Sequence, residues 1–217
     1  MKNIEVVSFD IDGTLIDIPI ELTIESRKNT AERFFSDETL KEKINKESEN
    51  TKKSFSKILK KYAENDNIKL ILDQYNKNTL DLIKKYKDRI KTYDGIPELL
   101  KNLKDRGYEL GIISNGLKAL QYLKLNIAKI DKYFDDEKIL ISSDYSFSKP
   151  DKKIYIEFLK KFGLEKNPEK VLFIDDNRDN VLGAKKVGIK AYLSNWKNFI
   201  TFNTPKDLKN YINFSKD

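Results

Sequence analysis

Apolar residues follow two periodicities along the chain, and each periodicity dominates its own region. Short, nearly continuous apolar runs are typical of strands that are buried on both faces of a sheet. Such runs occupy residues 4–9, 109–114, 138–142, 171–174 and 190–193. Helix-like spacing of apolar residues separates the later runs, at residues 96–106, 117–126, 152–162 and 180–187. The pattern therefore predicts an α/β fold with a parallel sheet covered by helices on both faces.

The segment between the first two predicted strands has a different pattern. No glycine lies between Thr14 and Asp94, and no proline lies between Ile20 and Ile96. Helical spacing is clearest at Ile68, Ile71, Leu72, Tyr75, Thr79, Leu82, Ile83, Tyr86 and Ile90, with an earlier helix indicated by Ile44, Thr51, Phe55, Ile58, Leu59 and Tyr62. We therefore predict an inserted all-helical domain at residues 17–92, and a sheet-containing core at residues 1–16 and 93–217.

The composition removes several classes of chemistry. The chain has 217 residues but neither cysteine nor histidine, which excludes disulfides, thiolate metal sites and any histidine-based triad. The net charge is +7, but acidic residues are interleaved with the basic ones, which favours a solvated surface over nucleic-acid binding. The first residues lack the apolar stretch of a signal peptide, and no apolar run reaches membrane-spanning length. We expect a cytoplasmic protein without nucleic-acid or membrane partners.

Polar side chains follow the predicted strands at the point where each strand ends. Asp10, Asp12 and Thr14 come after the first strand, and Ser114 and Asn115 end the second. Further along the chain, Lys149 follows the third strand, and Asp175 and Asp176 end the fourth. Each of these four groups has an ordinary structural explanation on its own, such as a turn or a helix cap. Parallel strands have their carboxyl ends at one edge of the sheet. Four such groups in order, each after a predicted strand, therefore indicate one shared site rather than four unrelated turns.

Carboxylates gathered at one edge repel each other, and a hard divalent cation such as Mg²⁺ relieves that repulsion through oxygen ligands. Hydroxyl, amide and ammonium groups beside them can bind phosphate oxygens. A carboxylate held in such an array can attack phosphorus and form an acyl phosphate. The residue types and their order therefore favour phosphoryl chemistry at this edge.

The sequence resembles the haloacid dehalogenase superfamily, over roughly residues 1–16 and 93–195. The resemblance rests on DIDGT (residues 10–14), SNG (114–116), KPD (149–151) and IDDNRDN (174–180). It implies a Rossmann-like core, in which the inserted helical domain serves as a cap over the active site. It also implies a magnesium cofactor and a small phosphorylated metabolite as the partner.

The same resemblance implies a role for each matched residue. Asp10 is expected to be the nucleophile and a metal ligand, and Asp12 the general acid and base, with its backbone carbonyl as a further ligand. Ser114 and Asn115 are expected to bind the phosphoryl group, and Lys149 to neutralise both Asp10 and the phosphate. Asp176 is expected to be a metal ligand, supported by Thr14, Asp175 and Asn180. The family often has an acid where this chain has Asn180, so the outer part of the metal site differs from the common pattern.

Asp12 distinguishes between the reactions of the superfamily, because the dehalogenases have a non-acidic residue at this position. An acid is present here, which favours hydrolysis of phosphate esters. We therefore predict a phosphomonoesterase that uses an aspartyl phosphate. Its substrate is expected to be a sugar or triose phosphate, phosphoglycolate or a nucleoside monophosphate. The alternatives are a phosphosugar mutase that uses the same intermediate, a 2-haloacid dehalogenase, or a binding module with an inactive site. Arg27, Lys28 and Arg33 could contact a second anionic group of the substrate, but we expect them to be surface charges. Both a monomer and a homodimer are compatible with the sequence.

Overall fold

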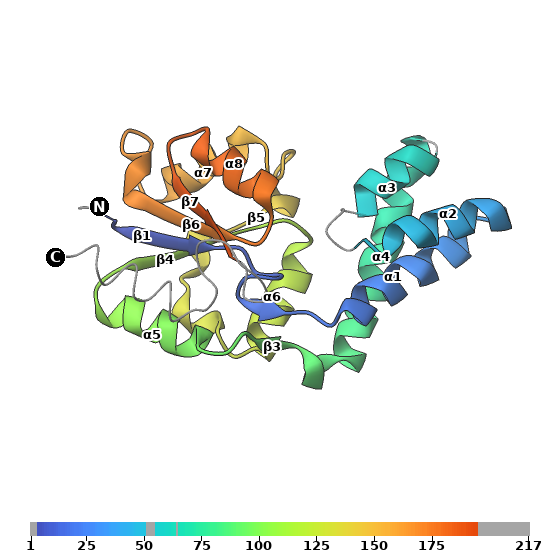
Figure 1. The fold of residues 1–217 in the computed structure, drawn as a ribbon, viewed down its shortest axis with the longest axis horizontal. Helices are drawn as coiled ribbons and strands as arrows, with labels where there is room; N and C mark the ends of the chain where they lie inside the picture. The colour runs from blue at the N-terminus through green and yellow to red at the C-terminus, as the bar shows by residue number, and fades with distance from the viewer. Residues whose placement is uncertain (1–3, 51–54, 64, 195–217) are drawn as a thin grey trace. The chain divides into compact units, whose positions relative to one another are not determined.

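The computed structural model describes residues 4–50, 55–63 and 65–194, and the chain divides into two compact units (Figure 1). The first unit comprises residues 1–17 and 91–217, and the second comprises residues 18–90. Thr51, which was assigned to the earlier of the two predicted helices, lies outside the described residues, as does the chain after residue 194. A short antiparallel pair, β2 (Ile16–Asp17) with β3 (Lys91–Thr92), lies where the chain leaves the first unit and returns to it. This pair was not predicted.

The first unit contains a five-stranded sheet with the order β5-β4-β1-β6-β7. Every pairing in it is parallel. The strands are β1 (Val6–Phe9), β4 (Glu109–Ser114), β5 (Ile139–Ile141), β6 (Val171–Asp175) and β7 (Lys190–Leu193). All five lie within two residues of the predicted runs, because residues buried on both faces leave a continuous apolar signal. The predicted α/β fold with a parallel, Rossmann-like sheet is confirmed.

Helices cover both faces of this sheet (Figure 1). On one face lie α7 (Lys152–Lys161) and α8 (Arg178–Lys185), and on the other α5 (Ile96–Asp105) and α6 (Lys118–Ile127). Tyr155 and Phe158 of α7 are fully buried, and the Tyr155 ring packs edge-on against Phe173 of β6, with 5.8 Å between centroids. A Cβ at Gly111 of β4 would lie 2.6 Å from the Phe158 ring, so glycine permits this close packing.

Short 3-10 helices complete the described secondary structure. They are η1 (Lys87–Arg89), η2 (Asp131–Tyr133), η3 (Asp136–Lys138), η4 (Ser142–Asp144) and η5 (Pro168–Lys170). Among the helices of the described ranges, none has both the length and the apolar character that a membrane span needs.

Among the described residues, the second unit has four α-helices with a core of their own. They are α1 (Ile20–Phe34), α2 (Glu38–Ser48), α3 (Phe55–Tyr62) and α4 (Asn65–Lys85). The earlier of the two predicted helices, from Ile44 to Tyr62, is divided between α2 and α3. Helix α1 was not predicted. The shared core contains Ala31, Ile44, Phe55, Ile58, Leu59, Ile68 and Ile71. Each large aliphatic or aromatic side chain buried in this way contributes about 1.5–3 kcal/mol to folding.

Arg27 is not the surface charge that we expected. Its side chain is buried in the second unit, where Nη1 donates to the carbonyl of Ser48 at 3.0 Å and the guanidinium lies over the Phe55 ring. Lys28 and Arg33 are exposed, as expected. The expectation was wrong for Arg27 because α1 was not predicted, so the face on which this residue lies was unknown.

Candidate active site

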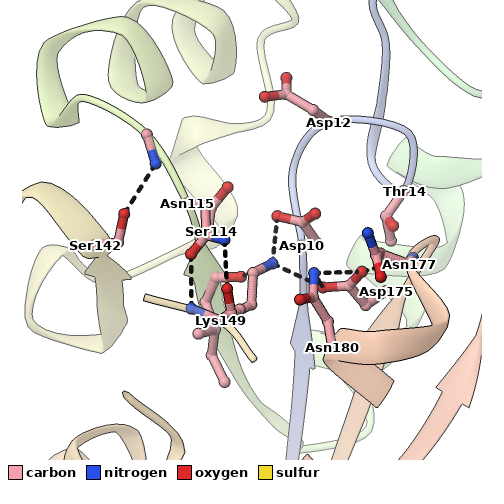
Figure 2. Close-up of polar contacts among 12 residues, drawn as sticks. Asp10, Asp12, Thr14, Ser114, Asn115, Ser142, Lys149, Asp175, Asn177 and Asn180 are labelled. Atoms are coloured by element: carbon pink, nitrogen blue, oxygen red, sulfur yellow. Dashed lines mark hydrogen bonds and ion pairs between the residues drawn. The ribbon is translucent and has the colours of Figure 1, made fainter. Parts of the chain in front are cut away.

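The sheet places Asp10 at the centre of its carboxyl edge. β1 lies between β4 and β6, and Phe9 is in register with Ile112 and with Ile174. Asp10 comes one step beyond this register, and its backbone N–H donates to the carbonyl of Ile174 at 2.9 Å. The acidic end of β6 is therefore next to Asp10, and the end of β4 lies on the other side (Figure 2).

Lys149 lies between two of these carboxylates (Figure 2). Its Nζ is 2.8 Å from Asp10 Oδ1, 2.7 Å from Asp175 Oδ2 and 2.8 Å from the carbonyl oxygen of Ile113. Only 1% of its side chain is exposed. Burial alone would lower the pKa of this ammonium group, but Asp10 and Asp175 outweigh that effect and raise the pKa. Lys149 is therefore held charged against Asp10.

Asn115 holds Lys149 through its backbone. Its Nδ2 donates to the carbonyl of Lys149 at 3.0 Å, and its Oδ1 accepts from the N–H of Lys149 at 2.9 Å. One amide hydrogen of Asn115 is left after these two bonds. The structure thus gives Asn115 a positioning role beside the expected contact with phosphate, which remains a prediction.

Asp175 is fully buried and has its hydrogen-bonding capacity largely filled. Besides Lys149, it accepts from the backbone N–H of Asn177 at 2.8 Å. The Nδ2 of Asn180 lies 3.1 Å from one oxygen of Asp175 and 3.0 Å from the other. An acid at position 180 could not donate in this way and would repel Asp175. Asparagine in place of the common acid therefore fits the local contacts.

Asp10, Asp175 and Asp176 form a cluster that could hold a metal ion, because each offers an oxygen within 4.8 Å of the others. Burial, together with the neighbouring carboxylates, raises the pKa of Asp10 to about 6 and that of Asp176 to about 7, although Lys149 opposes the shift at both. A hard divalent cation would relieve this repulsion, and the all-oxygen donor set fits Mg²⁺. Since the oxygens of Asp175 are already engaged, Asp10 and Asp176 are the better candidates for ligands.

Gly13 lets the loop after β1 pass directly against Asp176. Its φ is +79°, in the region that favours glycine, and a Cβ would lie 2.5 Å from Asp176 Oδ2. The turn and the close approach both require glycine here, so Gly13 keeps the Asp10 loop and the end of β6 in contact.

Three other predicted residues have different neighbours. Ser114 is buried, and its hydroxyl oxygen lies 2.9 Å from Nε2 of Gln121. Asp12 extends away from Asp10 (Figure 2), and Nζ of Lys124 lies 2.9 and 2.8 Å from its two carboxylate oxygens. The Thr14 hydroxyl lies 3.0 Å from that of Ser194.

Gln121 and Lys124 were missed from the sequence, although a signal was present. Both belong to the buried face of α6, together with Leu120 and Leu125. Polar residues within the apolar face of a helix need partners, and here the partners are Ser114 and Asp12.

A sequence profile of the haloacid dehalogenase-like hydrolase family matches residues 7–193 of the chain. The chain is a member of this family. The match spans the sheet, the helices on both faces and the loops that carry Asp10, Lys149 and Asp176. The family inferred from the four motifs is therefore confirmed.

Individual members of the haloacid dehalogenase-like family are similar over most of the chain. A phosphoglycolate phosphatase from Aquifex aeolicus is 27% identical over 193 residues, which cover 88% of this chain and 84% of the relative. The pyrophosphatase PpaX from Bacillus cereus is 25% identical over 194 residues, or 89% of this chain and 84% of the relative. A crystal structure of a phosphatase of this family from Thermococcus onnurineus has a TM-score of 0.68 at 24% identity, covering 98% and 99% of the two chains, and shows the same fold. The predicted enzyme class, a haloacid dehalogenase-like phosphatase, is confirmed.

Proposed function

We propose that the protein is a Mg²⁺-dependent phosphomonoesterase that acts on a small phosphorylated metabolite through an aspartyl phosphate on Asp10. The observation that carries this proposal is the surroundings of Asp10. Its carboxylate faces the buried Lys149 and belongs to a cluster with Asp175 and Asp176. Asp12, the acid that ester hydrolysis requires, follows two residues later in the same loop.

In the first step, a carboxylate oxygen of Asp10 attacks phosphorus, and the bond from phosphorus to the ester oxygen breaks. Asp12 gives its proton to the departing oxygen, so that the products are an alcohol and the aspartyl phosphate. Lys149 balances the charge of Asp10 and of the phosphoryl group. Ser114 and the remaining amide hydrogen of Asn115 donate to phosphoryl oxygens.

In the second step, a water molecule attacks the phosphorus of the aspartyl phosphate. Asp12 now accepts a proton from this water, and Asp10 departs as a carboxylate. Inorganic phosphate is released, and both aspartates return to their starting states. One residue thus serves as acid and then as base.

The proposed ligands of Mg²⁺ are Asp10, Asp176 and the backbone carbonyl of Asp12. Bound there, the ion would neutralise the phosphoryl group and stabilise the charge that develops on it. Asp175 supports this arrangement by holding Lys149 in place, and Asn180 in turn holds Asp175. Thr14, which is buried against Ser194, supports the loop that carries Asp10 and Asp12.

We propose that the helical unit, residues 18–90, acts as a cap that selects the substrate and excludes water during the reaction. The substrate candidates are the sugar or triose phosphates, phosphoglycolate and nucleoside monophosphates predicted from the sequence. The names of two relatives make phosphoglycolate and pyrophosphate the first compounds to test. The cytoplasmic location, the absence of nucleic-acid and membrane partners, and a monomeric or homodimeric state stay predictions.

The decisive experiment measures phosphate release from p-nitrophenyl phosphate and from a panel of phosphorylated metabolites, with Mg²⁺ and with a chelator. We expect hydrolysis that requires the metal and that disappears in Asp10→Asn. Asp105→Asn is a matched control, because Asp105 is a carboxylate in an exposed ion pair on α5, outside the site. Full activity of Asp10→Asn would contradict the assignment of the nucleophile. Conversion of a sugar phosphate to its isomer faster than phosphate release would instead indicate a mutase.

A further inference from the structure

Helix α6 carries two side chains, Gln121 and Lys124, that contact Asp12, and Gln121 also contacts Ser114. Nζ of Lys124 lies 2.9 Å from Oδ1 and 2.8 Å from Oδ2 of Asp12. Nε2 of Gln121 lies 3.2 Å from Oδ2 of Asp12, and 2.9 Å from the Ser114 hydroxyl oxygen. The two residues are three positions apart and therefore project from the same face of the helix.

Lys124 is largely buried, so its charge destabilises the fold unless the carboxylate of Asp12 stays beside it. Only 9% of the Lys124 side chain is exposed, whereas 39% of the Asp12 side chain is. Within the described ranges, Asp12 is the one carboxylate that forms an ion pair with Lys124. An ammonium group withdrawn from water is unfavourable without a counter-charge, so Lys124 constrains where the Asp12 carboxylate can lie.

The amide of Gln121 has only one chemically sensible orientation. Its Nε2 faces three acceptors, since the carbonyl of Asn115 lies 2.8 Å away in addition to Asp12 and Ser114. A flipped amide would point Oε1 at a carboxylate and a carbonyl. In the observed orientation Oε1 is buried with no hydrogen-bond partner among the described residues. A buried polar atom without a hydrogen-bond partner lowers the stability of the fold. The stability of the fold therefore does not explain why Gln121 is at this position.

We propose that Lys124 and Gln121 are positioning residues that hold Asp12 in place as the general acid and base. This inference rests on the proposed phosphatase function. Two contacts from Nζ fix the plane of the Asp12 carboxylate, and Gln121 fixes its position relative to Ser114. When Asp12 gives its proton to the departing oxygen, the carboxylate that forms already faces the Lys124 ammonium. Lys124 therefore stabilises the transition state of proton transfer without contacting the substrate.

Gln121 has a second consequence for Ser114. Because the Ser114 oxygen accepts a hydrogen bond from Nε2, its own hydroxyl hydrogen is left to be donated elsewhere. The free direction of that hydrogen suits a phosphoryl oxygen. One amide thus orients both the group that binds phosphate and the group that transfers the proton.

The test compares two substrates that differ in their need for an acid. An alkyl phosphate has a poor leaving group and requires protonation, whereas p-nitrophenyl phosphate expels a stable anion. Because the second step is common to both substrates, the rate that is measured is the release of the leaving group in a single turnover. In Lys124→Met, we expect this rate for the alkyl phosphate to fall about 30–100-fold, within the range that general acid catalysis contributes. For p-nitrophenyl phosphate, we expect a fall of less than about threefold, since little proton transfer is needed in that step. The substrate concentration that gives half of the maximal single-turnover rate should stay unchanged for both, because Lys124 does not touch substrate.

Three further variants make this test specific. Lys124→Arg keeps a cation near Asp12 and should recover part of the alkyl phosphate rate. Lys101→Met removes an exposed lysine from an ion pair with Asp105 on α5, and should leave both rates unchanged. Gln121→Leu should show the same dependence on the leaving group as Lys124→Met, and it replaces that variant if thermal unfolding shows Lys124→Met to be misfolded.

Equal losses in the single-turnover release of the two leaving groups would overturn the positioning role, because damage to the fold or to metal binding would slow both releases alike. A rise in the alkyl phosphate rate would also overturn it, since Lys124 would then restrain Asp12 from acting. A wild-type protein that hydrolyses neither ester would instead overturn the proposed function itself.

Discussion

Asp10 and Asp12 leave the same strand two residues apart, but their side chains have opposite surroundings. Asp10 is buried and faces Lys149 and two other aspartates. Burial, supported by the charge of Asp175, raises the pKa of Asp10 to about 6 although Lys149 lowers it. Asp12 is more exposed, extends the other way, and contacts Lys124 and Gln121 of α6. One loop therefore places a carboxylate suited to attack phosphorus and another suited to move protons. Two adjacent acids can serve such different roles only because different elements of the core surround them.

The largest expected effect is that of replacing Asp10. Asp10→Asn should lower kcat by about 10⁴-fold or more on every phosphate ester, because the nucleophile itself is lost. The measurement is steady-state phosphate release over a series of esters with leaving groups of different acidity. A loss that varies strongly with the leaving group would contradict the separation of roles between Asp10 and Asp12.

Asp12→Asn should give a smaller and more selective loss. We expect leaving-group release in a single turnover to slow about 10²–10⁴-fold on alkyl phosphates and much less on p-nitrophenyl phosphate, since only the poor leaving groups need the proton in the first step. Hydrolysis of the aspartyl phosphate, for which Asp12 is the base, should slow for both. The same ester series checks this. The free energy of unfolding should also fall, because the buried Lys124 loses its counter-charge, and urea denaturation measures this fall.

Much of this site could be anticipated from the sequence, for a physical reason. Asp10 directly follows a strand, and Ser114 and Asp175 each end one, so the parallel sheet alone is enough to bring them together. Lys124 and Gln121 could not be assigned in this way, because their partners depend on how α6 packs over the loop after β1. A polar residue on the apolar face of a helix signals a buried contact, but it does not say with which residue.

The helical unit was harder to anticipate than the sheet. Helices α2 and α3 were predicted as one, and α1 was missed, because charged residues interrupt the apolar spacing of these segments. Arg27 shows the consequence: its charge indicated the surface, but the packing of α1 buries it. Sheet register is strongly constrained by burial on both faces, whereas helix packing depends on individual side-chain contacts.

Lys149→Met tests the Asp10 side of the comparison through stability. It would leave Asp10 and Asp175 buried without their shared counter-charge, so we expect a loss of about 3–5 kcal/mol in the free energy of unfolding. Chemical denaturation in the presence of chelator measures this. Lys124→Met is the matched comparison and should cost less, because Asp12 can still reach water. Equal losses of unfolding free energy in the two variants would contradict the idea that burial separates the surroundings of Asp10 from those of Asp12.

The smallest expected effect is a dependence of metal-free stability on pH. The ordinary pKa of these carboxyls is 3.8, but it is about 6 for Asp10 and about 7 for Asp176 in the folded protein. The folded state therefore binds more protons than the unfolded state between these values, and its stability should fall as pH rises through this range. Thermal unfolding with chelator measures the fall.

Mg²⁺ should reverse this loss of stability, because the ion binds the ionised form of the cluster. Asp176→Asn should flatten the pH dependence, since the substituted residue no longer titrates. Asp12→Asn serves as the control and should leave the dependence largely as in the wild type. A stability that rises over the same pH range without metal would contradict the surroundings described for Asp10 and Asp176.

The most direct test of the central claim, that Asp10 is the nucleophile, is chemical trapping of the phosphorylated residue. The enzyme is mixed with substrate, quenched during turnover and reduced with borohydride, which converts an aspartyl phosphate to homoserine. Peptide mass spectrometry then locates the converted residue. We predict homoserine at position 10 and none at position 12, with more conversion in Asp12→Asn on p-nitrophenyl phosphate, where hydrolysis of the intermediate is slowed. Conversion at position 12, or turnover without conversion at position 10, would contradict this account.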